Sequence, residues 1–329
     1  MHDASASIPF RSIAAAVAEA IAVPGDGGLT LRLYRLRAGR RGGPVVLWGH
    51  CGSSAAGSYL PLLTRLAADA DVFAFDARGH GGSDAPQPSS LPPGDGVEPL
   101  YAPNRFARDV AAIARTVAAL APGRPIHYAA HSLNAAALLR LGACMPEDFA
   151  ALPWGNFALF EPPLFPPPQT ASYAEAREKN RMLIARTLVR RRIWAGPDML
   201  VDYLFGRGIF AAFSREDLRT HIAATLRPRP DGTFELACSP EIEAAMYAGF
   251  GEDSTWRCLP RFPYPDRVHM IGGDPDAGAD RDWVTAIVLE AAARLPGARI
   301  SVWRDHGHFM VFGDPARAAD TVRALYADS

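Results

Sequence analysis

The chain has 329 residues, of which 49% are apolar and 21% charged, and its formal net charge is −1. A chain of this length and apolar content can bury a large core without disulfides or a structural metal. The near-zero charge excludes an extended basic face on the chain as a whole, which argues against nucleic acid or an anionic membrane as the main partner. We therefore expect a globular protein that acts on a small, mostly neutral molecule; the sequence does not indicate its oligomeric state.

The N-terminal residues and the cysteines bear on the location of the protein. Residues 1–22 contain an apolar run, but Asp3 precedes it and Glu19 interrupts it, so we do not expect a signal peptide. No run reaches the roughly 18 apolar residues that a membrane-spanning helix needs. The four cysteines are scattered without a C-x-x-C pair, so neither a zinc site nor a disulfide framework is predicted. We expect a cytoplasmic protein with no metal and no cofactor.

Apolar periodicity predicts alternating strands and helices in the first half of the chain. Strands of a buried, parallel kind are expected where apolar runs are continuous, and helices where apolar residues recur every three or four positions. In chain order the predictions are a strand at 29–36, a strand at 44–50, a helix at 58–70, a strand at 71–80, a helix at 104–123 and a strand at 126–132. This order predicts an α/β fold, a doubly wound and mostly parallel sheet with helices on both faces.

The alternation stops after "FALFEPPLFPPP", and residues 164–264 read as a mainly helical, arginine-rich insertion whose clearest helix is 178–193. The strand pattern returns at "RVHMIGGD". We therefore predict an N-terminal extension at 1–22, a core formed by 23–163 and 265–329, and a helical cap at 164–264. Ligands of open α/β sheets bind at the carboxyl edge of the strands, which such a cap would cover. The run "VRRR" is interpreted as a solvated helix face rather than a phosphate site.

The stretch "AAHSLNA" has the pattern of a nucleophile elbow. Such an elbow places a nucleophile on a sharp strand-to-helix turn, with small residues two positions before and after it, usually as G-x-S-x-G. Ser132 stands at the nucleophile position, with Ala130 before it and Asn134 where glycine is usual. A serine that only caps the following helix explains the same residues. The partners that the elbow requires therefore decide between the two interpretations.

A serine nucleophile needs a histidine base and an acid that orients the base. His308 follows Gly307 after the last predicted strand and is the preferred base, with His306 as its rival. Three acidic residues lie at the C-terminal ends of predicted strands. Asp276 is the preferred acid to orient the histidine, and Glu161 and Asp274 are the alternatives. Each of the three could instead cap a helix or stabilise a turn.

The oxyanion of such a reaction needs two backbone N–H donors. Gly52, in the glycine-bearing loop "WGHCGSS", is the expected source of one, and Leu133, which follows the nucleophile, is the expected source of the other. Cys51 in the same loop is a candidate nucleophile in its own right, but it follows a strand without an elbow. The serine interpretation is therefore preferred.

The motifs "HCGSS", "DARGHGGSD", "AHSLNA", "GGDPD" and "GHF" occur in the order and spacing of the α/β-hydrolase fold superfamily, which the chain resembles from about residue 29 onward. The resemblance implies that Asp76 and Arg78 stabilise turns near the site rather than react. It implies hydrolase activity without naming a substrate. Ser132 at the nucleophile position differs from the aspartate of the haloalkane dehalogenase and epoxide hydrolase branches.

Two residues depart from the pattern of the superfamily: Cys51 stands where glycine usually follows the histidine of the oxyanion loop, and Asn134 stands in place of the elbow glycine. The working hypothesis is a serine hydrolase that cleaves an ester, thioester or lactone of a small, partly apolar acyl compound. Acyl transfer or cofactor-free perhydrolysis is an alternative within catalysis. A non-catalytic protein that binds a hydrophobic ligand is the alternative that the two departures motivate.

Overall fold

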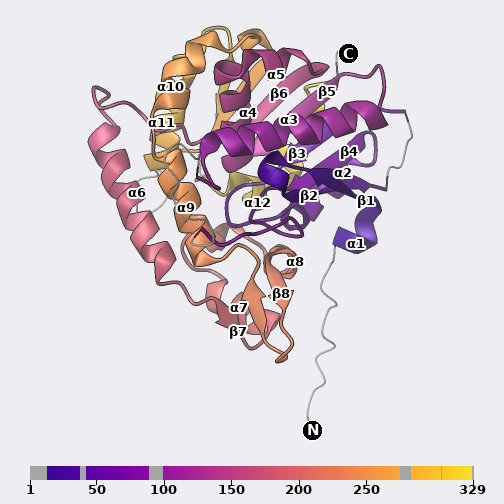
Figure 1. Cartoon of the computed structure of the whole chain (residues 1–329), viewed down its shortest axis with the longest axis vertical. Helices are drawn as coiled ribbons and strands as arrows, with labels where there is room; N and C mark the ends of the chain where they lie inside the picture. Colours follow the sequence, from indigo (N-terminus) through magenta and orange to yellow (C-terminus); the bar gives the residue numbers. More distant parts are fainter. Residues whose placement is uncertain (1–12, 38–41, 89–98, 275–282, 305, 328–329) are drawn as a thin grey trace.

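The computed structural model describes residues 13–37, 42–88, 99–274, 283–304 and 306–327. An eight-stranded sheet lies at its centre, in the order β1-β2-β4-β3-β5-β6-β10-β11 (Figure 1). β2 is antiparallel to both of its neighbours, and the remaining pairs are parallel, which confirms the predicted mostly parallel α/β sheet. The strands are β1 (Val17–Pro24), β2 (Thr30–Leu36), β3 (Val45–Gly49), β4 (Asp71–Asp76), β5 (Ile126–His131), β6 (Trp154–Phe160), β10 (Val268–Gly272) and β11 (Arg299–Val302).

The strand expected at 29–36 is β2, and a strand that the sequence did not predict, β1, precedes it. Residues 1–22 were expected to form an extension outside the core, but β1 starts at Val17 and pairs with β2 from Val17↔Leu36 to Pro24↔Thr30. An edge strand that faces solvent on one side needs few apolar residues, and only Val23 of β1 is buried. The boundary at residue 23 was therefore placed too late, and the first 12 residues lie outside the described part.

Alternating side chains of the central strands separate two apolar layers. On β3, Val45 and Leu47 belong to one layer, and Val46 and Trp48 belong to the other. Helices α3, α4 and α11 contribute to the first layer, and α2 and α13 to the second, so the sheet is covered on both faces. The helices outside the insertion are α1 (Ile13–Ala16), α2 (Leu60–Leu66), α3 (Pro103–Leu120), α4 (Leu133–Cys144), α5 (Pro146–Ala150), α11 (Trp283–Ala292), α12 (Met310–Gly313) and α13 (Pro315–Arg323).

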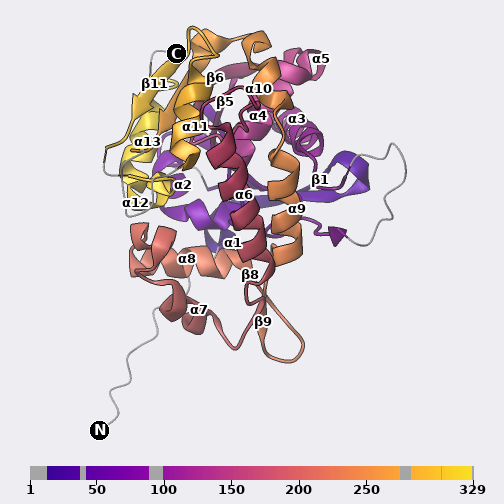
Figure 2. The same ribbon diagram turned by 90° about the vertical axis from the view of Figure 1, so that its left-hand side faces the viewer.

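The middle of the segment between β6 and β10, about residues 193–236, extends below the sheet in the views of Figures 1 and 2, whereas its end at residues 254–258 lies near the top. We call residues 164–264 the cap segment. It contains α6 (Tyr173–Leu188), β7 (Ile193–Trp194), α7 (Pro197–Leu204), α8 (Arg215–Thr225), β8 (Leu226–Pro228), β9 (Phe234–Leu236), α9 (Pro240–Phe250) and α10 (Ser254–Cys258). The small antiparallel sheet β7-β9-β8 was not predicted, because strands of two or three residues are too short to show a period of two.

The expected length of the clearest cap helix, and the expected role of the basic run at its end, need correction. The helix expected at 178–193 ends at Leu188, so the basic run that follows does not form a helix face. Arg190 in that run forms an ion pair with buried Glu243, with 2.7 Å between Nη1 and Oε2. At the other end of the segment, α10 packs against α4 of the core, and Arg140 of α4 donates hydrogen bonds to Glu252 and Thr255.

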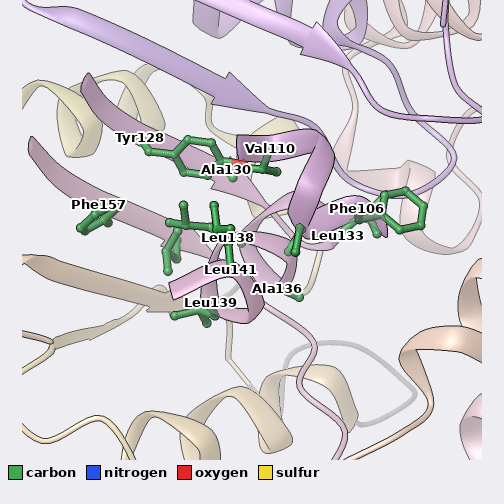
Figure 3. Packing of buried hydrophobic residues seen from close by; sticks show 14 of the residues in the cluster. Phe106, Val110, Tyr128, Ala130, Leu133, Ala136, Leu138, Leu139, Leu141 and Phe157 are labelled. Atoms are coloured by element: carbon green, nitrogen blue, oxygen red, sulfur yellow. The ribbon is translucent and has the colours of Figure 1, made fainter. Parts of the chain in front are cut away.

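The helix that follows β5 is enclosed by apolar side chains. Figure 3 shows Leu138, Leu139 and Leu141 of α4 packed among residues of β5, β6 and α3, including Tyr128 and Phe157. All residues of α4 from Leu133 to Ala143 are buried. The first turn of α4, and the residue immediately before it, are therefore held in place by the core.

Candidate active site

Ser132 lies on the sharp turn between β5 and α4. Its backbone has φ 54° and ψ −110°, a conformation that non-glycine residues rarely adopt. The N–H of Ser132 donates to the carbonyl of Phe160 at 2.8 Å, which links the turn to the end of β6. Packing of α4 supplies the free energy that keeps a strained residue in place. The serine is thus presented at the carboxyl edge of the sheet, in the geometry of a nucleophile elbow.

The imidazole of His308 bridges Ser132 and Glu161. The Nε2 atom lies 3.0 Å from Ser132 Oγ, and the Nδ1 atom lies 3.2 Å from Glu161 Oε2. A carboxylate only accepts hydrogen bonds, so the proton of the neutral ring is on Nδ1 and the lone pair of Nε2 faces the serine hydroxyl. This is the tautomer that a general base for Ser132 requires.

Glu161 is fully buried at the end of β6, and its own backbone has φ 50°. Its N–H donates to the carbonyl of Ile271 at 2.8 Å, which continues the pairing of β6 with β10. The carboxylate accepts hydrogen bonds from the N–H of Gly273 and from the hydroxyl of Thr285, the latter at 3.0 Å. Buried charge is costly unless it is paired and hydrogen-bonded, and these donors meet that need.

The other two acids considered from the sequence occupy different positions. Asp276, the preferred candidate, lies outside the described residues. Asp274 is described: its N–H donates to the carbonyl of His306 at 2.6 Å, and its carboxylate lies 3.9 Å from Arg304. The structure thus brings Ser132, His308 and Glu161 together, which the sequence offered only as an alternative set.

The backbone of His308 is held by a hydrogen-bonded pair that the sequence did not reveal. His131 Nε2 lies 2.8 Å from the carbonyl of His308, and His131 Nδ1 lies 2.7 Å from the hydroxyl of Tyr59. Burial lowers the pKa of His131 well below its usual value, so the ring is neutral. Its Nε2–H must donate to the carbonyl, and its Nδ1 must accept from Tyr59.

The Tyr59 hydroxyl in turn accepts a hydrogen bond from the N–H of Cys51 at 3.1 Å. One continuous series of hydrogen bonds therefore connects the loop that contains Gly52 with the loop that contains His308. His131 was part of the elbow motif, but nothing in its neighbours indicated a partner on the last strand's loop, 177 residues away.

The loop after β3 brings Gly52 beside the elbow. Gly52 and Leu133 both line the cavity that contains Ser132. Among the described residues, nothing accepts a hydrogen bond from the N–H of Gly52, and Leu133 is the first residue of its helix, where the N–H has no partner in the helix. Both residues proposed from the sequence as backbone donors therefore border the cavity that contains Ser132.

Asn134 stabilises this loop. Its Nδ2 donates to the carbonyl of His50 at 2.7 Å. A Cβ atom on Gly49 would lie 2.5 Å from the Cβ of Asn134, so the glycine at the end of β3 leaves the space that the asparagine fills. The departure from the usual elbow pattern is therefore matched by a small residue on the facing strand.

Cys51 and His306 have surroundings that differ from those of a nucleophile and a base. The thiol of Cys51 donates to Ser54 Oγ at 3.3 Å, and burial raises its pKa to about 11, so the reactive thiolate is absent at neutral pH. His306 Nδ1 lies 2.9 Å from the carbonyl of Arg304, and its ring contacts the edge of Trp303. The described geometry therefore does not support the cysteine alternative.

The loop "DARGHGGSD" has the structural role that was expected. Asp76 accepts hydrogen bonds from Ala56 N–H and Gly82 N–H, both at 2.8 Å, and Arg78 forms a buried ion pair with Asp109 at 2.6 Å. Both residues stabilise turns around the site without lining the cavity.

A cavity of about 1340 Å³ lies above Ser132 and His308 and is lined mainly by the cap segment. This volume exceeds the 300–1,000 Å³ that is common for small-molecule sites. Of the five cap aromatics named as possible contacts, three line the cavity: Trp194, Tyr203 and Phe210. Phe213 instead stacks on Phe312, and Phe205 is 40% exposed.

The described residues show neither a metal site nor a membrane span. They contain no group of three or more histidine, cysteine or acidic side chains that could hold a metal ion. None of their helices combines the length and the apolar character that crossing a bilayer would require.

A sequence profile of the alpha/beta hydrolase family matches residues 45–321. The chain belongs to that family. This alpha/beta hydrolase matches no curated protein. Similar solved structures include E-2-(acetamidomethylene)succinate hydrolase (TM-score 0.69, 23% identity, 93% of this chain and 99% of that one). The thioesterase domain from the curacin biosynthetic pathway has a TM-score of 0.65 and 17% identity, with 93% of this chain and 99% of that one covered. The enol-lactonase from Burkholderia xenovorans LB400 has a TM-score of 0.60 and 17% identity, with 94% of this chain and 100% of that one covered.

At these identities the structural neighbours of the hydrolase establish its fold alone. The residues that sequence reasoning missed in it are Tyr59, His131 and Thr285, none of which reacts in the arrangement described above. Each forms a hydrogen bond with a residue that is distant in the chain, and such contacts leave no periodic signal in a sequence.

Proposed function

We propose that this protein is a serine hydrolase that cleaves an ester, thioester or lactone of a partly apolar acyl compound through an acyl-enzyme. The observation that carries the proposal is the position of the His308 ring, 3.0 Å from Ser132 Oγ and 3.2 Å from Glu161 Oε2. The mainly apolar lining of the cavity supports an apolar acyl group. Structural neighbours described as a thioesterase and an enol-lactonase act on the same class of bond.

In the proposed mechanism, Ser132 Oγ attacks the substrate carbonyl while His308 Nε2 accepts the hydroxyl proton. The carboxylate of Glu161 stabilises the imidazolium that forms. The N–H groups of Gly52 and Leu133 donate to the oxyanion of the tetrahedral intermediate. His308 then protonates the leaving group, and it later activates the water that hydrolyses the acyl-enzyme. Glu161 takes the place of Asp276 as the proposed acid.

The test is covalent labelling with a fluorophosphonate probe, read by intact mass, for the wild type and for Ser132→Ala. We expect one adduct on the wild type and none on the variant, because only an activated serine attacks phosphorus readily. Hydrolysis of a panel of thioesters and lactones by the wild type should fall by several orders of magnitude in Ser132→Ala, on the scale known for other triads. A folded wild type with no adduct and no turnover would contradict the proposal and favour a non-catalytic binding protein.

A further inference from the structure

One wall of the cavity above Ser132 is formed by a single face of helix α6. The residues of that face are Lys179, Met182, Leu183 and Arg186, which recur at the spacing i, i+3, i+4 and i+7 of a helix surface. Arg190 and Arg191, just beyond the end of the helix, extend the same wall. Figure 2 shows α6 beside α9, the helix that carries Glu243.

The charges of the cavity lining are unequal. Four basic side chains line it, namely Lys179, Arg186, Arg190 and Arg191, and the carboxylate of Glu243 is the single acidic group among the described lining residues. Arg190 already neutralises that carboxylate, because its two terminal nitrogens lie 2.7 and 3.2 Å from the carboxylate oxygens of Glu243. Tyr247 also donates to Glu243, at 2.8 Å.

The remaining three cations have no carboxylate partner within 4 Å in the described part of the chain: Lys179, Arg186 and Arg191. We call these three residues the basic wall. Of the neighbouring arginines that do not line the cavity, Arg181 contacts Glu178 at 2.7 Å and Arg192 contacts Glu235 at 3.2 Å. Arg177 instead donates to the hydroxyl of Tyr173. The basic wall therefore carries positive charge that no carboxylate of the described residues neutralises.

Arg191 is also oriented by its surroundings. Its guanidinium lies 4.4 Å from the ring centre of Trp194, which lines the cavity as well, and its Nε donates to the carbonyl of Ile193 at 2.8 Å. A guanidinium stacked on an indole retains its terminal N–H groups for a carboxylate or phosphate. Trp194 Nε1 in turn donates to the carbonyl of Arg191, which fixes the pair.

We propose that the substrate of this protein carries an anionic group, a carboxylate or a phosphate, which binds the basic wall while the acyl carbon lies at Ser132. An apolar cavity that bears several uncompensated cations attracts anions more strongly than an open surface does, because low-dielectric walls focus the field. The inference rests on the proposed hydrolase function and specifies its substrate class. It also explains why the lining combines apolar side chains with basic ones.

Three thioesters with five-carbon acyl groups separate the possibilities. Pentanoyl-N-acetylcysteamine is neutral, glutaryl-N-acetylcysteamine carries a carboxylate on the acyl group, and pentanoyl-coenzyme A carries phosphates on the leaving group. For the wild type we expect kcat/KM of one anionic thioester to exceed that of the neutral one by about tenfold or more, equivalent to about 1.4 kcal/mol. The anionic thioester that is preferred identifies the source of the charge.

The variant Lys179→Gln/Arg186→Gln/Arg191→Gln should lose this preference, mainly through a higher KM, and the preference of the wild type should fall as salt is added. Arg181→Gln is the matched control on the same helix and should keep the preference. Equal kcat/KM for all three thioesters in the wild type, or an unchanged preference in the triple variant, would overturn the proposal.

Anion binding can also be tested in a variant that does not turn over substrate. Calorimetric titration of Ser132→Ala with glutarate, and separately with coenzyme A, should show binding that the three additional glutamine substitutions weaken by about tenfold. If the wild type hydrolyses no thioester but Ser132→Ala binds an anion through the basic wall, the hydrolase proposal fails and the anion site stands. If neither ligand binds, the basic wall is a solvated surface and the inference is wrong.

Discussion

At the carboxyl edge of the sheet, the side chains of Ser132, His308 and Asn134 are buried or partly buried, and each has a hydrogen-bond partner. The cavity wall formed by the basic wall instead presents cations that have no carboxylate partner among the described residues. The edge belongs to a packed core that holds even a residue with positive φ in place. In the basic wall Lys179 is partly buried, whereas Arg186 and Arg191 are exposed and available to a ligand. The difference suggests that the edge determines the reaction and that the cap determines which molecule undergoes it.

Among the residues that support the pair Ser132 and His308, the largest effect should come from breaking the contact between His308 and its acid. Glu161→Gln is expected to lower kcat by about 10³-fold, because an amide no longer stabilises the imidazolium and can hold the wrong tautomer of His308. Stopped-flow kinetics measure the rate of acylation, which should fall together with kcat. Asp276→Asn is the control and should lower the rate far less; a larger effect of Asp276→Asn would return the acid role to Asp276.

A smaller loss is expected from Tyr59→Phe, which removes the hydroxyl between Cys51 N–H and His131 Nδ1. The backbone of His308 and the loop of Gly52 then lose their connection, and kcat should fall by about tenfold while KM changes little. Steady-state kinetics on a neutral thioester checks this. Tyr101→Phe is the control: it removes a hydroxyl that donates to the carbonyl of Pro86 at 2.6 Å, and it should leave kcat unchanged. If kcat fell equally in both variants, the cause would be a general loss of stability instead.

Asn134→Ala should affect both stability and rate. The change leaves the carbonyl of His50 without its donor, at a cost of about 1–3 kcal/mol in the free energy of unfolding. It should also loosen the loop of Gly52 and lower kcat several-fold. Urea unfolding and thioester hydrolysis measure the two effects. Asn156→Ala, which removes a bond of 2.6 Å to the carbonyl of Leu325, is the matched control that should lose stability alone.

The smallest effect concerns the pH dependence of stability. Burial lowers the pKa of His80 to about 4, and its Nε2 accepts from the N–H of Ser53 at 3.2 Å. The unfolded pKa is about 6.5, so unfolding takes up a proton below that pH. The contribution of His80 to stability is therefore complete above pH 6.5 and is lost progressively toward pH 4.

His80→Gln, which retains an acceptor and a donor, should reduce the decline in the free energy of unfolding between pH 6.5 and pH 4. Urea unfolding at pH 7, 6 and 5 at constant ionic strength makes the comparison. An identical slope in the variant and the wild type would show that other groups are responsible for the pH dependence.

The sequence by itself determined the order of strands and helices, the elbow at Ser132 and the placement of His308 at a strand end. Apolar periodicity is a local property, and parallel strands bring their carboxyl ends to a common edge, so these features can be read along the chain. The family resemblance followed from the order and spacing of the motifs along the chain.

Only the tertiary structure brought Glu161 within 3.2 Å of His308, since three acids follow strand ends in the sequence and their spacing does not order them. It also decided the role of Asn134, whose partners lie on a strand and loop about 84 residues earlier. The pairing of Arg190 with Glu243, which leaves the basic wall unpaired, was likewise invisible in the run "VRRR". These outcomes depend on side chains from distant elements that meet only after the sheet and the cap segment have packed, and no local pattern records such contacts.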